Sequence, residues 1–271
     1  MCGILGLWCQ KSVPDINIID KLFTYAEKRG KDGVGYFIYN SRSKVTSFRK
    51  FKESYSEVRV ELLSLISKEL TINSVLLGIC RSQPETEGNT TIVNMQPIVH
   101  DPKGLYLVHN GAISNRIYNE LKKWNKEEND SNYYYTTNID SEAILVSYLK
   151  HNRNIKDALE YLSGGMACLM VDSEKNCLFL WNDHQPLSHS YIRGDLGCYF
   201  LHSSDECLRD IVKYTCHATA DGVCCWEQWY GHPLNGPRIK ILDLESGFVS
   251  TIKYSPRYIT STWDSYLSKQ K

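Results

Sequence analysis

Cys2 is the residue whose type and position most directly suggest chemistry in this sequence. A small second residue favours removal of the initiator methionine, which would leave Cys2 with a free α-amine. Such an amine has an ordinary pKa of about 7.7 to 8.0, so near neutral pH it can accept the proton of the adjacent thiol. One residue would then supply both a nucleophile and its base. Considered alone, a cysteine at position 2 is more often a buried thiol without a chemical role.

Several further segments carry residue types that bind or polarise an amide. They are RGKDGVG (29–35), Arg81, Asn94–Pro97, His109-Asn110-Gly111, Asp140-Ser141-Glu142, Asn182-Asp183 with Pro186-Leu187, and Ser203-Ser204. With MCGILG at the start, these segments resemble, in the same order, class II glutamine amidotransferases, such as the glutaminase domains of asparagine synthetase and amidophosphoribosyltransferase. Chance agreement of so many motifs in the same order is improbable. The resemblance implies an N-terminal-nucleophile (Ntn) hydrolase fold.

The resemblance also implies an enzyme that hydrolyses L-glutamine to glutamate and ammonia through a γ-glutamyl thioester on Cys2. Members of the family pass ammonia to a synthetase or transferase domain, for which the roughly 20 residues after position 250 leave no room. We therefore expect the acceptor enzyme on a separate chain. Two alternatives stay open, namely a catalytically silent regulatory or interaction subunit and an Ntn hydrolase of another amide.

Recognition of free glutamine requires a cation for the α-carboxylate and an anion for the α-ammonium. Arg81 follows the apolar run SVLLGIC and is suited to a bidentate, charge-assisted pair with the carboxylate. Asp140 is the natural partner of the ammonium, although it would also serve as a plain helix N-cap.

Attack on the side-chain amide creates an oxyanion that needs preorganised donors. By the resemblance, the Asn110 side-chain amide and the Gly111 backbone N–H supply them, and His109 and Thr86 are substrate-binding candidates. On spacing alone, Asn-Gly would instead indicate a tight turn. The loop RSQPETEG after Cys80 departs from the arginine, aromatic, Thr-Gly pattern of many family members, which makes Thr86 a weak candidate.

Composition narrows the remaining function classes. The 31 Lys and Arg residues balance 31 Asp and Glu residues, which argues against nucleic-acid binding. No apolar run approaches the roughly 20 residues of a membrane span, and no basic leader is evident. The sequence therefore predicts a cytoplasmic protein with mostly reduced cysteines.

Cysteine and histidine side chains gather in the second half of the chain but do not follow metal-site spacing. No C-x2-C pair or regular His spacing is present in the region, so we expect neither a metal nor another cofactor. The residues concerned are Cys198, His202, Cys207, Cys216, His217, Cys224, Cys225 and His232.

The elements that position these residues alternate between short strands and helices. Strands are indicated at 1–10, 33–40, 44–51, 74–81, 104–109, 166–172, 177–183, 191–203 and 238–244, and helices at 20–29, 54–70, 113–124, 140–151 and 205–215. The polar stretch 126–138 suggests a mobile surface loop or lid. This pattern favours antiparallel sheet with helices covering its faces in one domain, and the resemblance implies an α+β fold, a four-layer αββα sandwich of two mainly antiparallel sheets. The predicted domain spans residues 1–250, with a C-terminal tail at 251–271.

Overall fold

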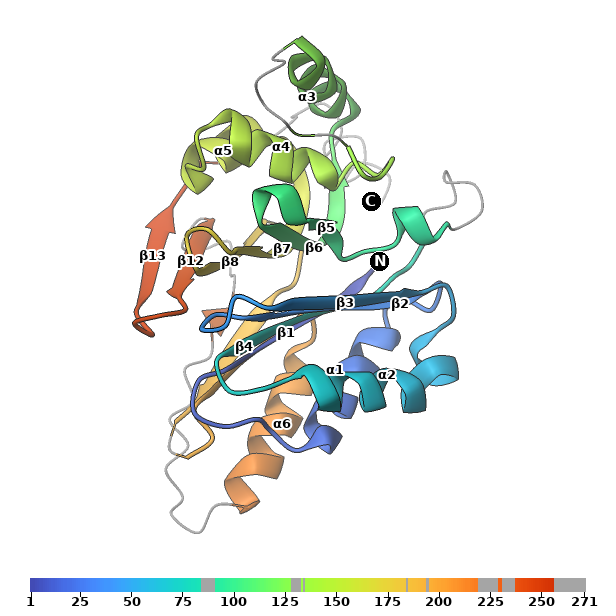
Figure 1. Ribbon diagram of the computed structural model, residues 1–271, viewed down its shortest axis with the longest axis vertical. Helices are drawn as coiled ribbons and strands as arrows, with labels where there is room; N and C mark the ends of the chain where they lie inside the picture. The colour runs from blue at the N-terminus through green and yellow to red at the C-terminus, as the bar shows by residue number, and fades with distance from the viewer. Residues whose placement is uncertain are drawn as a thin grey trace, which may run out of the picture.

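The computed structural model describes residues 1–83, 91–127, 133, 135–183, 185–193, 195–218, 229–230 and 237–255. Two antiparallel sheets face each other, and a layer of helices covers the outer face of each sheet (Figure 1). This arrangement confirms the predicted four-layer αββα sandwich.

The first sheet has seven strands in the order β11-β9-β10-β1-β4-β2-β3. The strands are β1 (Gly3–Cys9), β2 (Val34–Asn40), β3 (Thr46–Phe51), β4 (Ser74–Cys80), β9 (Ser188–Ile192), β10 (Cys198–His202) and β11 (Trp229–Tyr230). Helices α1 (Ile16–Glu27), α2 (Tyr55–Glu69) and α6 (Asp205–Ala218) cover its outer face. Strand β1 is central and fully buried, because both of its faces carry apolar side chains.

The second sheet has six strands in the order β13-β12-β8-β7-β6-β5. The strands are β5 (Ile98–His100), β6 (Leu105–Ile113), β7 (Gly164–Asp172), β8 (Cys177–Asp183), β12 (Arg238–Asp243) and β13 (Val249–Lys253). Helices α3 (Asn115–Glu127), α4 (Glu142–Lys150) and α5 (Ile155–Tyr161) form its outer layer, and 3-10 turns lie at Ile92–Asn94 and Asp101–Lys103. Strand β13 crosses residue 250, where we placed the domain boundary.

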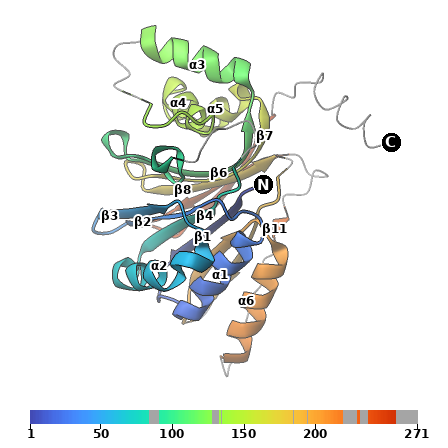
Figure 2. The same ribbon diagram turned by 90° about the vertical axis from the view of Figure 1, so that its right-hand side faces the viewer.

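Three apolar cores separate the four layers. The core between the sheets takes alternate residues of β1, such as Ile4 and Trp8, together with Tyr106 and Val108 of β6. The intervening residues of β1 pack on the helices of the first sheet instead. The N-terminus lies between the two sheets in both views (Figures 1 and 2). The period-2 pattern of the strands therefore brings the start of β1 close to the second sheet.

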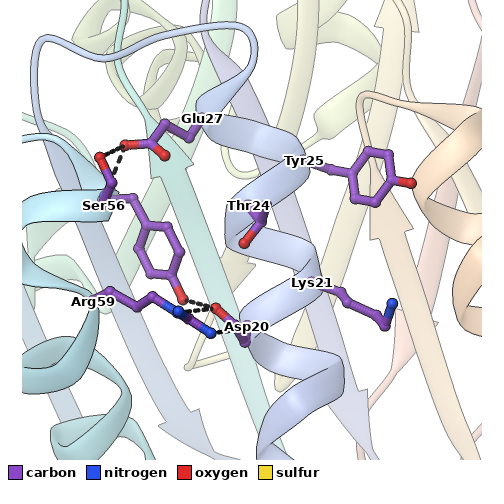
Figure 3. A pocket seen from close by; sticks show the side chains of 8 residues that line it. Asp20, Lys21, Thr24, Tyr25, Glu27, Ser56 and Arg59 are labelled. Atoms are coloured by element: carbon purple, nitrogen blue, oxygen red, sulfur yellow. Dashed lines mark hydrogen bonds and ion pairs between the residues drawn. The ribbon is translucent and has the colours of Figure 1, made fainter.

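Polar contacts join α1 to α2 in the outer layer below the first sheet (Figure 3). The Tyr55 hydroxyl donates to Asp20 Oδ1 at 2.6 Å, and Arg59 Nε donates to the same oxygen at 2.7 Å. Farther along the two helices, the Ser56 backbone N–H donates to Glu27 Oε1 at 2.7 Å. The carboxylates of Asp20 and Glu27 thus both hold α1 against α2.

Two element predictions need correction. The strand predicted to end at His109 continues through Asn110 and Gly111 to Ile113, so Asn-Gly is not a turn and α3 begins later than predicted. The predicted single strand at 191–203 is a hairpin, since β9 and β10 pair with Tyr191 opposite Tyr199. The hairpin predicted for 33–51 is confirmed by the pairing of β2 and β3.

Glu142 anchors the end of the polar stretch that we expected to be mobile. Its buried carboxylate accepts bonds from the Tyr133 hydroxyl and from the backbone and hydroxyl groups of Thr136 and Thr137, at 2.6 to 3.1 Å. Tyr133 is itself buried. This part of the stretch is therefore packed, whereas residues 128–132 and 134 lie outside the described residues.

Replacing Glu142 by Gln should destabilise the protein, because an amide NH2 would face N–H and O–H donors in a buried site. We expect the free energy of unfolding to fall by about 2 to 3 kcal/mol. Glu120→Gln, on the exposed face of α3, is the matched control and should change it by less than about 0.5 kcal/mol. Urea unfolding measures both, and equal effects of the two substitutions would contradict the anchoring role.

Candidate active site

Cys2 and Asn110 meet where the two sheets face each other. Cys2 directly precedes β1, and its backbone nitrogen donates to Asn110 Oδ1 at 3.0 Å. Asn110 lies on β6 and is 2% exposed. Next to Cys2, Gly3 admits no side chain, because a Cβ there would lie 2.1 Å from the Ala26 carbonyl oxygen. The C-terminal end of α1 therefore packs directly on the backbone at Gly3, the residue that follows Cys2.

The Cys2 thiol lies against the segment after β4. Its sulfur is 3.4 Å from the Ser82 backbone nitrogen and 3.7 Å from the Ser82 carbonyl oxygen. Arg29 Nε donates to the Cys2 carbonyl oxygen at 3.1 Å. Burial raises the pKa of the Cys2 thiol, against the Ser82 N–H and the positive charges of Arg81 and Arg29, which lower it. The thiol is thus mostly protonated at neutral pH.

Arg81 lies close enough to Cys2 for its charge to act on the thiol. Its backbone N–H donates to the Gly33 carbonyl at 2.8 Å, and its own carbonyl accepts from the Asp32 N–H at 2.9 Å. The residue is 3% exposed. These bonds tie the RGKDGVG segment to the end of β4, so the two motifs that are 50 residues apart in sequence form one wall of the site.

Strand β6 directs alternate N–H groups away from its neighbour β7. The bonds from Ser114 N to Ser163 O and from Ser173 N to Gly104 O, at 2.8 and 2.9 Å, flank both ends of the ladder. Hydrogen-bonded and non-hydrogen-bonded pairs alternate along an antiparallel ladder. Since Gly104 and Ser114 belong to hydrogen-bonded pairs, Leu105, Leu107, His109, Gly111 and Ile113 belong to the non-hydrogen-bonded pairs. The backbone N–H groups of these residues therefore point away from β7.

Two of these N–H groups, one on each side of Gly111, donate hydrogen bonds to side-chain oxygens. The His109 N–H donates to Gln96 Oε1 at 2.7 Å, and the Ile113 N–H donates to Asp140 Oδ2 at 2.6 Å. Gly111 lies between them, its backbone exposed, with its N–H directed to the same side. Gln96 and Asp140 thus flank a backbone donor that follows directly after Asn110.

Asp140 and His109 both make hydrogen bonds within the protein that the sequence did not predict. Asp140 bonds the β6 backbone, and the N-cap of α4 is Ser141. His109 is 1% exposed, and its Nδ1 lies 2.8 Å from Ser141 Oγ. Burial lowers the pKa of His109, opposed by the charge of Asp140. Gln96, Ser82 and Gln185 also reach this region, and residue types and spacing had assigned none of them a role individually.

Some of the candidate residues named from the sequence lie where the structure describes no geometry. Thr86 lies outside the described residues, as do Cys224, Cys225 and His232 of the cysteine and histidine group. Within the described ranges, no group of three or more His, Cys, Asp or Glu side chains is arranged to hold a metal ion. In the same ranges no helix has the length and apolarity needed to cross a membrane.

Comparison with known proteins adds family information to this geometry. Residues 89–209 match the family model described as a glutamine amidotransferase domain. The chain is 26% identical over 242 residues to glutamine–fructose-6-phosphate aminotransferase (isomerizing) of Clostridium perfringens, covering 84% of this chain and 37% of that protein. It is 32% identical over 188 residues to amidophosphoribosyltransferase of Pasteurella multocida, covering 63% and 34%. The chain thus spans about a third of the length of these relatives.

A solved structure supports the fold. The glutamine phosphoribosylpyrophosphate amidotransferase of B. subtilis, in complex with ADP and GMP, superposes with a TM-score of 0.64 at 20% identity. The match covers 94% of this chain and 49% of that one. At this identity the likeness concerns the fold alone, and it agrees with the predicted sandwich of two mainly antiparallel sheets between helical layers.

Gly111 should tolerate no side chain, which distinguishes its backbone from that of an ordinary strand. Its φ is +140°, and a Cβ would lie 1.9 Å from the Gly165 carbonyl oxygen. We expect Gly111→Ala to lower the free energy of unfolding by about 1 to 3 kcal/mol. For the control Gly165→Ala, the nearest atoms to the new Cβ are 3.8 Å away, so stability should hardly change. Thermal unfolding compares the two, and a stable Gly111→Ala variant would contradict the close approach.

Proposed function

We propose that this protein, which carries a class II glutamine amidotransferase domain, releases ammonia from L-glutamine with Cys2 as its nucleophile. The observation that carries the proposal is the bond from the Cys2 backbone nitrogen to Asn110 Oδ1. This bond joins the residue that can become an N-terminal nucleophile to a carboxamide, and the next residue of β6, Gly111, has its backbone N–H directed away from β7. An acyl-transfer site needs these three groups together.

The proposed reaction begins after removal of Met1, when the Cys2 nitrogen becomes an α-amine. That amine takes the thiol proton, directly or through water, and the thiolate attacks the side-chain carbonyl carbon of glutamine. Because burial raises the pKa of the thiol, the base is needed at neutral pH. The Asn110 Nδ2 and the Gly111 N–H stabilise the resulting oxyanion, and each such donor is typically worth about 2.7 to 4 kcal/mol.

Collapse of the tetrahedral intermediate breaks the carbon–nitrogen bond. The α-ammonium of Cys2 returns its proton to the leaving nitrogen, so that ammonia departs and a γ-glutamyl thioester remains. A water molecule, deprotonated by the same amine, then attacks the thioester carbonyl and releases glutamate, and the ammonium returns its proton to the Cys2 sulfur. In this scheme Cys2 supplies the nucleophile, and its amine takes part in every proton transfer.

Substrate binding is assigned to charges around the thiol. Arg81 pairs with the α-carboxylate of glutamine, and its position next to Ser82, whose backbone N–H lies 3.4 Å from the Cys2 sulfur, supports this assignment. Asp140 pairs with the α-ammonium through the oxygen that does not hold Ile113. We assign His109 the role of positioning the neighbouring Asp140, because its buried ring contacts Ser141, the residue after Asp140.

The destination of the ammonia is a separate part of the proposal. The relatives named above are transferases about three times as long as the segment they share with this chain. We propose that a synthetase or transferase on a separate chain accepts the ammonia.

Active-site labelling tests the nucleophile. We expect the purified protein, treated with the glutamine analogue 6-diazo-5-oxo-norleucine, to lack Met1 and to carry one adduct on Cys2, by intact and peptide mass. Arg81→Lys should lower the labelling rate at least about tenfold, since a lysine cannot form the bidentate pair. Arg116→Lys on the exposed face of α3 is the matched control and should label like the wild type.

The same experiment separates the alternatives. A retained Met1 or an unlabelled Cys2 would favour a catalytically silent subunit and remove the proposed function. If Cys2 of the Arg81→Lys variant is labelled at the wild-type rate, the pocket does not select for a free amino acid. That result would indicate an Ntn hydrolase acting on another amide.

A further inference from the structure

The side chain of Gln185 occupies the donor that the proposed reaction assigns to the oxyanion. Asn110 Nδ2 donates to Gln185 Oε1 at 3.2 Å, while Oδ1 of the same carboxamide accepts from the Cys2 nitrogen at 3.0 Å. The two ends of one buried amide therefore hold the nucleophile's backbone and the Gln185 side chain.

Gln185 presents the same chemical group as the substrate. A glutamine side chain ends in the primary carboxamide that L-glutamine offers for hydrolysis, and here its carbonyl oxygen accepts from Asn110 Nδ2. Its Nε2 lies over β7, 3.8 Å from the point where a Cβ on Gly165 would be. Gly165 pairs with Ala112, next to Gly111. The Gln185 amide thus lies over the part of the two strands that contains both proposed oxyanion donors.

The backbone around Gln185 is held while its side chain is half-buried. Gln185 lies on the connection from β8 of the second sheet to β9 of the first. Asn182 Nδ2 donates to the Gln185 carbonyl oxygen at 3.0 Å, and Leu187 is buried two residues later. Anchors on both sides keep the side chain within reach of Asn110, so rotation about its side-chain bonds is enough to leave the donor.

We propose that Gln185 is an internal pseudosubstrate, a tethered carboxamide that competes with glutamine for Asn110. The inference rests on the proposed function. The bound Gln185 amide takes one N–H of Asn110 Nδ2 and fills the space over β7 beside Gly165, where the substrate amide must compete with it, so only the fraction of molecules with Gln185 displaced binds glutamine productively. The apparent affinity falls by that fraction, and the chemical step after displacement is unchanged. Gln185 therefore raises KM and leaves kcat alone.

Two substitutions at this position should act in opposite directions. Gln185→Ala removes the competing oxygen, and we expect KM for glutamine to fall at least about threefold with kcat within about twofold of the wild type. Gln185→Glu replaces the amide by a carboxylate that accepts a stronger, charge-assisted bond from Asn110, so KM should rise. Gln10→Ala, after the opposite end of β1, is the matched control and should leave both constants unchanged.

Steady-state glutaminase kinetics on the wild type and the three variants test whether Gln185 competes with glutamine, and 6-diazo-5-oxo-norleucine labelling rates give a second readout. If the wild type turns over glutamine while Gln185→Ala and Gln185→Glu leave KM unchanged, the pseudosubstrate is overturned and the proposed function stands. A folded Gln185→Ala variant with a large loss of kcat also overturns it, because Gln185 would then assist catalysis. A wild type that neither labels nor turns over overturns both, since each needs the same pocket.

Discussion

The site depends on one buried carboxamide that serves both sheets. Asn110 accepts from the Cys2 nitrogen through Oδ1 and donates through Nδ2, so its orientation is fixed by the backbone that precedes β1. An amide can satisfy both partners in only one of its two orientations, because one end accepts and the other donates. In the proposed reaction, the contact between the sheets therefore determines which group of Asn110 faces the substrate carbonyl, and the chemistry requires the packing of the four layers.

The second proposed donor is a backbone N–H of β6 that points away from β7. A strand without a neighbour would leave a row of N–H groups open. Here Gln96 and Asp140 occupy the positions at His109 and Ile113, and Gly111 is left between them with its N–H directed outward. The positive φ of Gly111 and its closeness to β7 require glycine at this point. Because Gln96 and Asp140 accept from the neighbouring N–H groups, the N–H of Gly111 is the one between them that faces outward.

The sequence predicts the parts of this arrangement that are encoded locally. Strand periodicity and the ordered motifs predict the four-layer fold and place Cys2, Asn110 and Gly111 in one site. Local rules also misread Asn-Gly as a turn, because the strand conformation there depends on pairing with β7, far along the chain. The roles of Gln96 and Gln185 depend on side-chain contacts between distant segments, for which glutamine has no distinctive spacing. The five bonds to Glu142 were hidden for the same reason, since an acidic residue opening a helix has an adequate local explanation.

The central claim is that the two ends of the Asn110 amide have separate duties, and Asn110→Asp tests it most directly. The aspartate keeps an oxygen for the Cys2 nitrogen but has no N–H for the oxyanion. Steady-state kinetics on protein that has lost Met1 should show kcat for glutamine hydrolysis reduced by about 100- to 1000-fold, while iodoacetamide still alkylates Cys2. A kcat within about twofold of the wild type would show that Asn110 does not stabilise the oxyanion and would contradict the account.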